Sequence, residues 1–236
     1  MADGIKIDAR VTAGLHPDNV RKLDGYDDET ALVCAATLDA FDAAYRGVGS
    51  VFDARAAASQ DPTLNEAAVA IATQDVADRV FTRVAEKFDS ATAFLKKNIA
   101  ILESEMTKPI EAQASYQISQ EIRAHVAKLA PGERMQFVQR AINGGDHRSA
   151  TAVLGAPSYL SGLGDDMHAV LVRMYHEKHN RGAAVRIKAM KGALELCEKR
   201  SGLIFSELEK AVGMPAHRVK ELKDRKAHAD RLLKSA

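Results

Sequence analysis

Apolar residues recur at helical spacing along most of the chain, and almost no segment alternates with the period of two that is typical of a strand. The clearest pattern follows an acidic segment at residues 27–30. It has steps of three and four residues: Ala31, Cys34, Leu38, Phe41, Tyr45, Val48 and Phe52. Such steps put the apolar side chains on one narrow stripe, as in a coiled coil. The sequence predicts a long helix whose interaction seam faces a helix of the same chain or of a neighbouring subunit; this seam consists of Leu38, Phe41, Tyr45, Val48 and Phe52.

A second long helix is predicted after a turn at residues 59–62. Thr63 and Glu66 have the spacing of a capping box, and Pro109 ends the pattern after Lys108. A helix of this extent is roughly 65–70 Å long. A compact globule of this chain length is only about 45 Å across. We therefore expect either an elongated molecule or a helix that belongs to a larger assembly.

The rest of the chain divides at glycine and proline residues. Residues 1–26 form an N-terminal arm, broken by Gly14, Pro17 and Gly25, with a short extended piece at Ile5, Ile7 and Val11; we expect the arm to be ordered only by packing on another surface. Beyond Pro109, the pattern predicts a helix over 110–130, and a second one that Pro131-Gly132 separates from it and Gly144-Gly145 ends. It then predicts helices over 147–154 (with Asp146 as N-cap), 166–212 and 216–233. Gly182, Gly192 and Gly202 mark kinks, breaks or close contacts within the helix over 166–212.

These elements predict an all-α fold of long antiparallel amphipathic helices. It has a coiled-coil-like hairpin over residues 27–108 and a helical C-terminal region over residues 110–236. The composition agrees with an ordinary globular protein, because 46% of the 236 residues are apolar and 28% are charged. The small net charge of +1 hides an asymmetry: residues 1–118 carry −7 and residues 119–236 carry +8. This asymmetry suggests head-to-tail association or an acidic partner, or else two solvated faces of opposite sign.

Cys34 and Cys197 are far apart in the sequence and have no ligand-spaced neighbours, so we expect two buried thiols in a reducing compartment. The first residues lack the apolar stretch of a signal peptide. No apolar run approaches the roughly 20 residues that a membrane span needs. We therefore expect no contact with a membrane.

Residues 140–163 contain an unusual joint between helices. Its pattern comprises Ala141, Ile142, Gly145, Asp146, Val153, Leu154, Ala156, Pro157, Leu160, Ser161, Gly162 and Leu163. This pattern resembles a stretch of uncharacterised helical proteins encoded by tailed bacteriophages and prophages, although Gly144 stands where those proteins usually have a polar residue. The resemblance covers about a tenth of the chain and implies a role in the virion or its assembly, but no activity. A purely structural interpretation of the same residues is a C-cap glycine, an N-cap Asp, a short helix and a proline stop.

The segment from Leu208 to Leu222 resembles a helix-turn-helix. Arg218, Lys220 and Lys223 would then be candidate nucleic-acid contacts, because residues 214–236 carry a net charge of +4. Glu209, however, stands where a small apolar residue normally packs between the two helices. The simpler interpretation is a corner between two helices, followed by a solvated basic tail.

No pattern predicts a catalytic, cofactor or metal site. His176 and His179, with His168 upstream, lack the spacing of a zinc protease motif, and an exposed polar face explains them better. The acidic pairs Asp27-Asp28 and Asp165-Asp166 stand where helices begin, so capping explains them. The sequence thus favours a non-enzymatic structural or assembly component of a bacteriophage particle, which would be located in the virion or in the host cytoplasm. Its partners would be itself, other virion proteins, or both; the alternative is a nucleic-acid-binding regulator.

Overall fold

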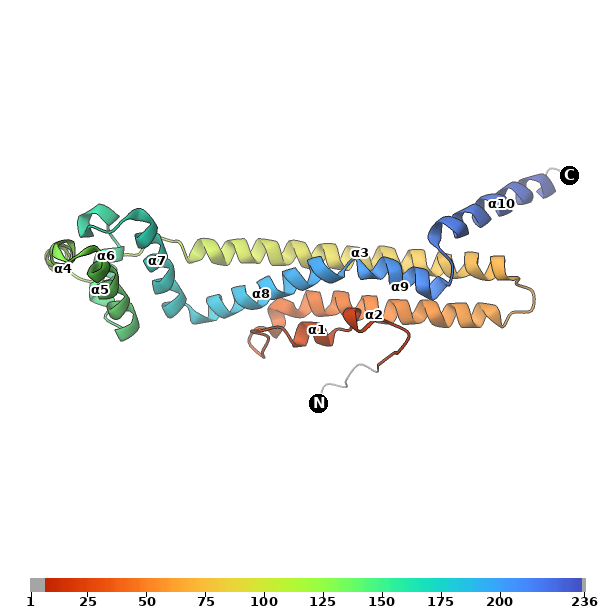
Figure 1. Cartoon of the computed structure of the whole chain (residues 1–236), viewed down its shortest axis with the longest axis horizontal. Helices are drawn as coiled ribbons and strands as arrows, with labels where there is room; N and C mark the ends of the chain where they lie inside the picture. Colours follow the sequence, from red (N-terminus) through yellow and green to blue (C-terminus); the bar gives the residue numbers. More distant parts are fainter. Residues whose placement is uncertain (1–6, 235–236) are drawn as a thin grey trace. The chain divides into compact units, whose positions relative to one another are not determined.

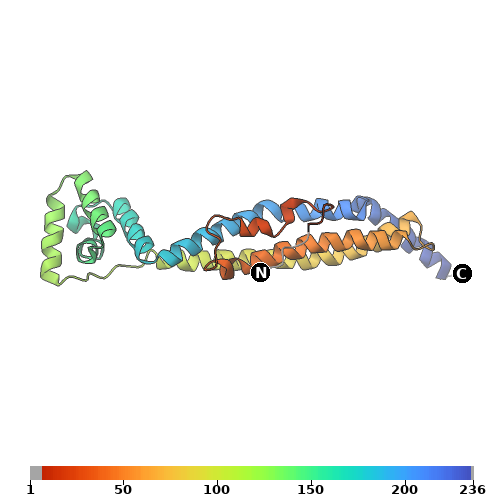
Figure 2. The same ribbon diagram turned by 90° about the horizontal axis from the view of Figure 1, so that it is seen from below.

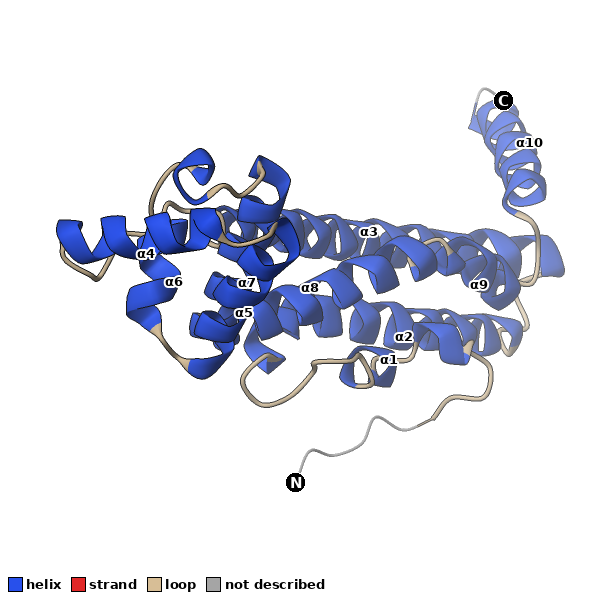
Figure 3. Ribbon diagram, turned by 60° about the vertical axis from the view of Figure 1, so that its left-hand side comes forward, coloured by secondary structure: helices blue, strands red, loops and turns tan. Residues whose placement is uncertain are grey.

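The computed structural model describes residues 7–234, and in that part the chain is built from helices joined by turns and loops, with no strand (Figures 1 and 3). The elements are η1 (Ala13–Leu15), α1 (Asp18–Arg21), α2 (Ala31–Ser59), α3 (Glu66–Glu105), α4 (Tyr116–Lys128), α5 (Pro131–Gly144), α6 (His147–Leu154), η2 (Ser158–Ser161), α7 (Asp165–His179), α8 (Arg181–Arg200), α9 (Leu203–Val212) and α10 (Ala216–Lys234). The all-α prediction is confirmed. Among these residues, no helix pairs the apolar character with the length that a bilayer crossing requires.

The structure divides the chain differently from the predicted hairpin and C-terminal region. One compact unit, unit 1, consists of residues 1–96 together with 189–236, and the other, unit 2, consists of residues 97–188. The C-terminal helices return to the N-terminal half because α9 has an apolar face to bury. Its Ile204, Leu208 and Val212 are 3%, 7% and 3% exposed. Burial of such side chains is the main driving force for packing.

Unit 1 is built around α2, most of α3, the end of α8, and α9, which lie side by side (Figures 1 and 2). Helices α2 and α3 are antiparallel and in direct contact. The rings of Phe41 and Phe88 meet edge to face at 5.2 Å. At Gly47, an added Cβ atom would lie 2.7 Å from Val80, so the missing side chain lets the two helices approach closely.

The N-terminal arm packs on its own chain. Leu15 and Val20 are fully buried, and Val11 is 5% exposed. Their burial orders the segment around η1 and α1 against α2 and α9, so the surface that orders the described part of the arm belongs to its own chain. Of the expected extended piece, Ile7 is exposed, and Ile5 lies outside the described residues.

Unit 2 has a core of its own, formed by α4, α5, α6, α7 and the linker after α3 (Figure 3). Fully or almost fully buried members of this core are Val126, Val138, Ile142, Val153 and Leu171. The linker between α3 and α4 is not helical, although the sequence predicted a helix from residue 110. It is extended here because Ile110 reaches into the core and the Gln113 amide donates to Thr151 Oγ1 at 3.0 Å.

The predicted start of α3 is wrong in detail. Thr63 does not cap this helix, because its hydroxyl and amide both donate to Asp61 Oδ1. Asn65 takes the capping role instead, since its Oδ1 accepts the Ala68 amide at 2.9 Å. Helix α3 begins at Glu66 and ends at Glu105, three residues before the predicted end.

The predicted helix over residues 166–212 is three helices. It breaks first at Asn180, whose backbone leaves the helical region at φ −120° and ψ 53°. It breaks again at Ser201 and Gly202, between α8 and α9. Gly202 therefore marks a real interruption, whereas Gly182 and Gly192 lie inside α8.

Candidate interaction surfaces

The predicted seam on α2 faces the inside of unit 1. Phe41 and Val48 are fully buried and Tyr45 is 3% exposed, while Leu38 and Phe52 are half-buried. Phe41 packs on Phe88 of α3. The seam therefore serves mainly as an internal contact between helices of one chain.

The arm covers the part of the seam that α3 leaves open. Tyr45 Oη accepts the Asp8 amide at 2.7 Å and donates to the Asp8 carbonyl at 3.1 Å. The Arg10 guanidinium lies 5.3 Å from the centre of the Phe52 ring and also donates to Asp8. The hydrogen bonds from the side chain and the backbone amide of Arg10 hold the pKa of Asp8 at about 2, well below the usual range, because they stabilise the charged carboxylate.

Other contacts of the arm were invisible in the sequence because their partners are about 200 residues away. The Thr12 amide donates to Glu207 Oε2 at 2.9 Å. Lys210 Nζ donates to the Arg10 carbonyl at 2.8 Å, and Arg200 Nη1 donates to the Gly14 carbonyl at 3.2 Å. No local signal marks Glu207 in the sequence, although it is a buried acidic residue.

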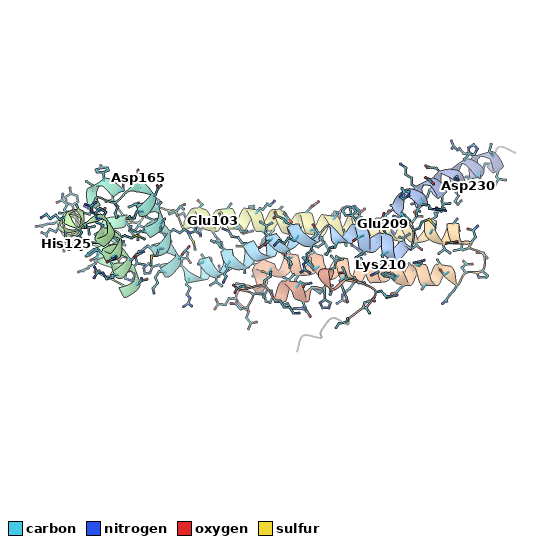
Figure 4. All side chains as sticks on the ribbon, viewed as in Figure 1. Glu103, His125, Asp165, Glu209, Lys210 and Asp230 are labelled. Atoms are coloured by element: carbon cyan, nitrogen blue, oxygen red, sulfur yellow. The ribbon has the colours of Figure 1, made fainter. Side chains whose placement is uncertain are left out.

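A tight turn joins α9 to α10, as the helix-turn-helix resemblance requires. Gly213 adopts the left-handed conformation at φ 76°. Glu209, at the end of α9 near the start of α10 (Figure 4), does not pack between the two helices. Its Oε1 accepts the Ala216 amide at 3.1 Å, so this carboxylate caps α10. Glu209, the residue that departs from the helix-turn-helix pattern, thus has a structural role in the corner between the two helices.

The three candidate nucleic-acid contacts on α10 do not form one surface. Arg218 and Lys220 are exposed, but two residues correspond to about 200° around a helix, so they point to opposite sides. Lys223 is held against α3, with its Nζ 2.7 Å from Asp75 Oδ1 and 3.4 Å from Asp78 Oδ2. The bond to Asp75 raises the pKa of Lys223 above its ordinary value.

The joint at residues 140–163 has the helix caps that the sequence predicted. Gly145 ends α5 at φ 75°, and Asp146 Oδ1 accepts the Ser149 amide at 3.0 Å at the start of α6. Gly162 adopts a second left-handed conformation, at φ 67°. Position 144 has open space around it, so the departure from the phage-like pattern there has no steric consequence.

Arg134 holds this joint together, a role that no local spacing in the sequence predicts. Its guanidinium donates to three backbone carbonyls, those of Ala127, Leu129 and Gly162. A Cβ atom at Gly162 would lie 2.8 Å from Arg134 Nη1. The arginine therefore ties the end of α4 to η2, and the left-handed φ of Gly162 favours a glycine beside it.

The histidines of α7 do not converge on one point. His168 Nε2 pairs with the Leu154 carbonyl at 3.1 Å, and His176 Nε2 pairs with the Lys108 carbonyl at 2.9 Å. The His179 ring instead packs at a tilt against His147, with ring centres 4.4 Å apart, and against Tyr175 at 4.2 Å. Among the described residues, no group of three or more His, Cys, Asp or Glu side chains could hold a metal ion.

Both cysteines are free thiols buried in unit 1, as predicted. Burial raises the pKa of Cys34 and raises that of Cys197 to about 11, because the thiolate is poorly solvated there. A thiol with a raised pKa is a weak nucleophile at neutral pH. These cysteines are therefore packing groups.

Each unit has an apolar hollow. In unit 2, a hollow of about 440 Å³ lies where residues 107–110 pass the end of α6 and the start of α7. In unit 1, a groove of about 370 Å³ lies between α3 and the junction of α8 with α9. Phe81 and Phe205 form its side, with ring centres 4.8 Å apart. Phe205 is 60% exposed, an unusual state for an aromatic side chain.

Comparisons with protein-family models, with curated proteins and with solved structures find no match for this chain.

Proposed function

We propose that this chain is a non-enzymatic structural or assembly component of a bacteriophage particle that acts through helical protein–protein contacts. The observation that carries the proposal is how little of α10 is buried by its own chain. This helix has 19 residues and buries only Val219. Isolated helices of this length are marginal in water, because most helical stability in proteins comes from packing of an apolar face. A helix so poorly covered by its own chain is best explained by a partner.

Two features of the sequence support the same proposal. The two halves of the chain have opposite charges, which favours association between unlike surfaces. The joint at residues 140–163 resembles a stretch of phage-encoded helical proteins. We infer that the partners are other copies of the chain, other virion proteins, or both, and that the chain is located in the virion or in the host cytoplasm during assembly.

Light scattering behind a sizing column tests the proposal, over a hundredfold range of concentration. We expect a defined oligomer, or a mass that grows with concentration. A single-chain mass at every concentration would contradict self-assembly. Mass spectrometry of particles purified from the phage that encodes the chain then tests its presence in the virion.

A second candidate is a nucleic-acid-binding regulatory protein, and the net charge of +4 on α10 favours it. It predicts binding to duplex DNA that weakens steeply with salt, because cations on the protein displace counterions from phosphates. Arg218→Ala with Lys220→Ala should reduce the salt dependence. Lys223→Ala should have a smaller effect, since Lys223 is already paired with Asp75 and Asp78.

A further inference from the structure

The groove of unit 1 has the character of a docking site for an apolar helix face. Its floor includes the buried side chains of Val84, Phe88 and Cys197. Phe81 and the exposed Phe205 form its side. All of its lining residues come from α3, α8, α9 and the turn between α8 and α9. The chain's own α10 therefore leaves this groove uncovered.

Helix α10 carries a seam that extends beyond its contact with the other helices of unit 1. The seam has steps of three and four residues and is apolar except for Lys226: Val219, Leu222, Lys226, Ala229 and Leu233. The first two are buried and half-buried, whereas the last three are exposed, Leu233 by 78%. Figure 4 shows the same trend, with Asp230 on the outer part of α10, away from the other helices of the unit. The seam thus begins on its own chain and ends without cover from it.

The net charges of α10 and of the rest of unit 1 indicate which surface the outer part of α10 binds. Unit 1 without α10 (residues 1–96 and 189–215) has 14 Lys/Arg and 20 Asp/Glu, a net charge of −6. Helix α10 has 7 Lys/Arg and 3 Asp/Glu, a net charge of +4. Two α10 helices would repel each other, whereas α10 and the body of unit 1 attract.

The contact that α10 already makes shows how this attraction works. Lys223 binds Asp75 and Asp78 on α3. Seven and eleven residues beyond Asp78, on the same face of α3 by helical spacing, stand Ala85 and Asp89, which line the groove. The acidic and apolar stripe that receives Lys223 therefore continues into the uncovered groove.

We propose that α10 of one copy docks through the outer part of its seam, including Leu233, in the Phe81–Phe205 groove of a second copy. This inference rests on the proposed function and names its partner. The first turns of α10 stay on their own copy, where Val219 is buried and Lys223 binds Asp75, and the outer turns reach the second copy. Reciprocal docking gives a closed dimer, and one-way docking gives a growing head-to-tail chain, as for any contact between two different surfaces.

Three single variants of the full chain, compared with wild type by light scattering, test the docking. Phe205→Glu alters the groove and Leu233→Glu alters the seam, and both positions are exposed enough for the fold to survive. Leu32→Glu is the matched control, since Leu32 is 83% exposed on α2 and does not line the groove. We expect the groove and seam variants each to raise the dissociation constant at least about tenfold, because apolar anchors dominate such contacts. The control should associate like wild type, and circular dichroism should show unchanged helicity in all three.

Mixing the two variants gives the sharpest test. The Phe205→Glu chain keeps an intact α10 and the Leu233→Glu chain keeps an intact groove, so a mixture restores one contact that neither variant has alone. We expect a heterodimer in the mixture. Association that Leu233→Glu abolishes but Phe205→Glu leaves unchanged would overturn the docking and leave the proposed function standing. A wild-type mass of one chain at all concentrations would overturn the docking and leave other virion proteins as the partners in the proposed function.

Discussion

At the scale of single residues, Gly155 has the strictest steric requirement in unit 2. A Cβ atom there would lie 2.5 Å from the Ile110 carbonyl oxygen and 2.8 Å from that of Thr151. Both are backbone atoms, which cannot turn aside like a side chain. Gly155→Ala should therefore lower the free energy of unfolding of unit 2 by about 2 kcal/mol, the usual cost of overpacking. Chemical denaturation monitored by hydrogen exchange measures the effect.

Gly144→Ala is the matched control for that substitution. Gly144 ends α5 with a negative φ, and an added Cβ atom there meets no atom within 4 Å. The alanine restricts the unfolded chain without straining the folded one, so stability should stay unchanged or rise by up to about 1 kcal/mol. Equal destabilisation by the two alanines would show that the close approach at Gly155 does not exist.

Asp146 provides a second test at the residue scale, through pH. Its bond with Ser149 lowers the pKa of the carboxyl below its ordinary value. Because the folded pKa is depressed, this contribution is complete above the unfolded pKa of about 4 and is lost as pH falls through the folded pKa. Asp146→Ala should cost about 1 kcal/mol at pH 7 and less at pH 2. Asp146→Asn, which keeps a capping oxygen, should lose little at pH 7; thermal unfolding across this range gives the comparison.

At the scale of helices, His179 and His147 make the contact between α7 and α6 sensitive to acid. Burial is the main factor that lowers the pKa of His179. The charges of His147, Lys178 and His176 lower it further. A histidine with a depressed folded pKa favours folding above its unfolded pKa of about 6.5, and this advantage disappears as pH falls below it. His147→Gln should raise the pKa of His179 towards its ordinary value and flatten the loss of stability between pH 7 and 5.

Histidine NMR titration checks this prediction directly. The control is His217→Gln, because His217 is an exposed histidine on α10, in unit 1, whereas His179 is in unit 2. That variant should leave the titration of His179 unchanged. If His147→Gln also leaves it unchanged, the ring contact at 4.4 Å does not govern the acid response.

Helix ends were predicted well where the residues that determine them are close together in the sequence. Asp146 and Gly145 were predicted as caps because their partners are adjacent in sequence. Asn65 was missed, since Thr63 offered an equally plausible spacing and only the fold decides between them. The break after α7 was also missed, because Asn180 carries a weaker local signal than glycine or proline.

The candidate surfaces were harder to predict for the same reason. The seam on α2 has an unmistakable pattern, but the pattern does not say that α3 and the arm cover it. The arm's partners Arg200, Glu207 and Lys210 follow from packing of elements about 200 residues apart, which no local spacing encodes. The seam on α10 follows steps of three and four residues in the sequence, but the same segment is basic, a charge that also fits nucleic-acid binding.

At the scale of the whole molecule, the two units have separate cores although α3 and α8 contribute residues to both. Leu15 of unit 1 and Leu171 of unit 2 offer the same substitution in each core, since both are fully buried. Leu15→Ala and Leu171→Ala should each lower the free energy of unfolding of its own unit by about 2–5 kcal/mol. Residues with no shared partners contribute independently, so the double variant should show the sum of the two effects.

Hydrogen exchange assigns each effect to its unit. Leu15→Ala should speed exchange in α2 and α9, and Leu171→Ala in α4 to α6, with little crossover. This result would also show that the arm stabilises unit 1 of its own chain, because Leu15 belongs to the arm. If Leu15→Ala leaves unit 1 unchanged, the arm is not part of its core. If either variant opens both units together, the molecule unfolds as one cooperative body, and the shared helices α3 and α8 are then the elements that couple the cores.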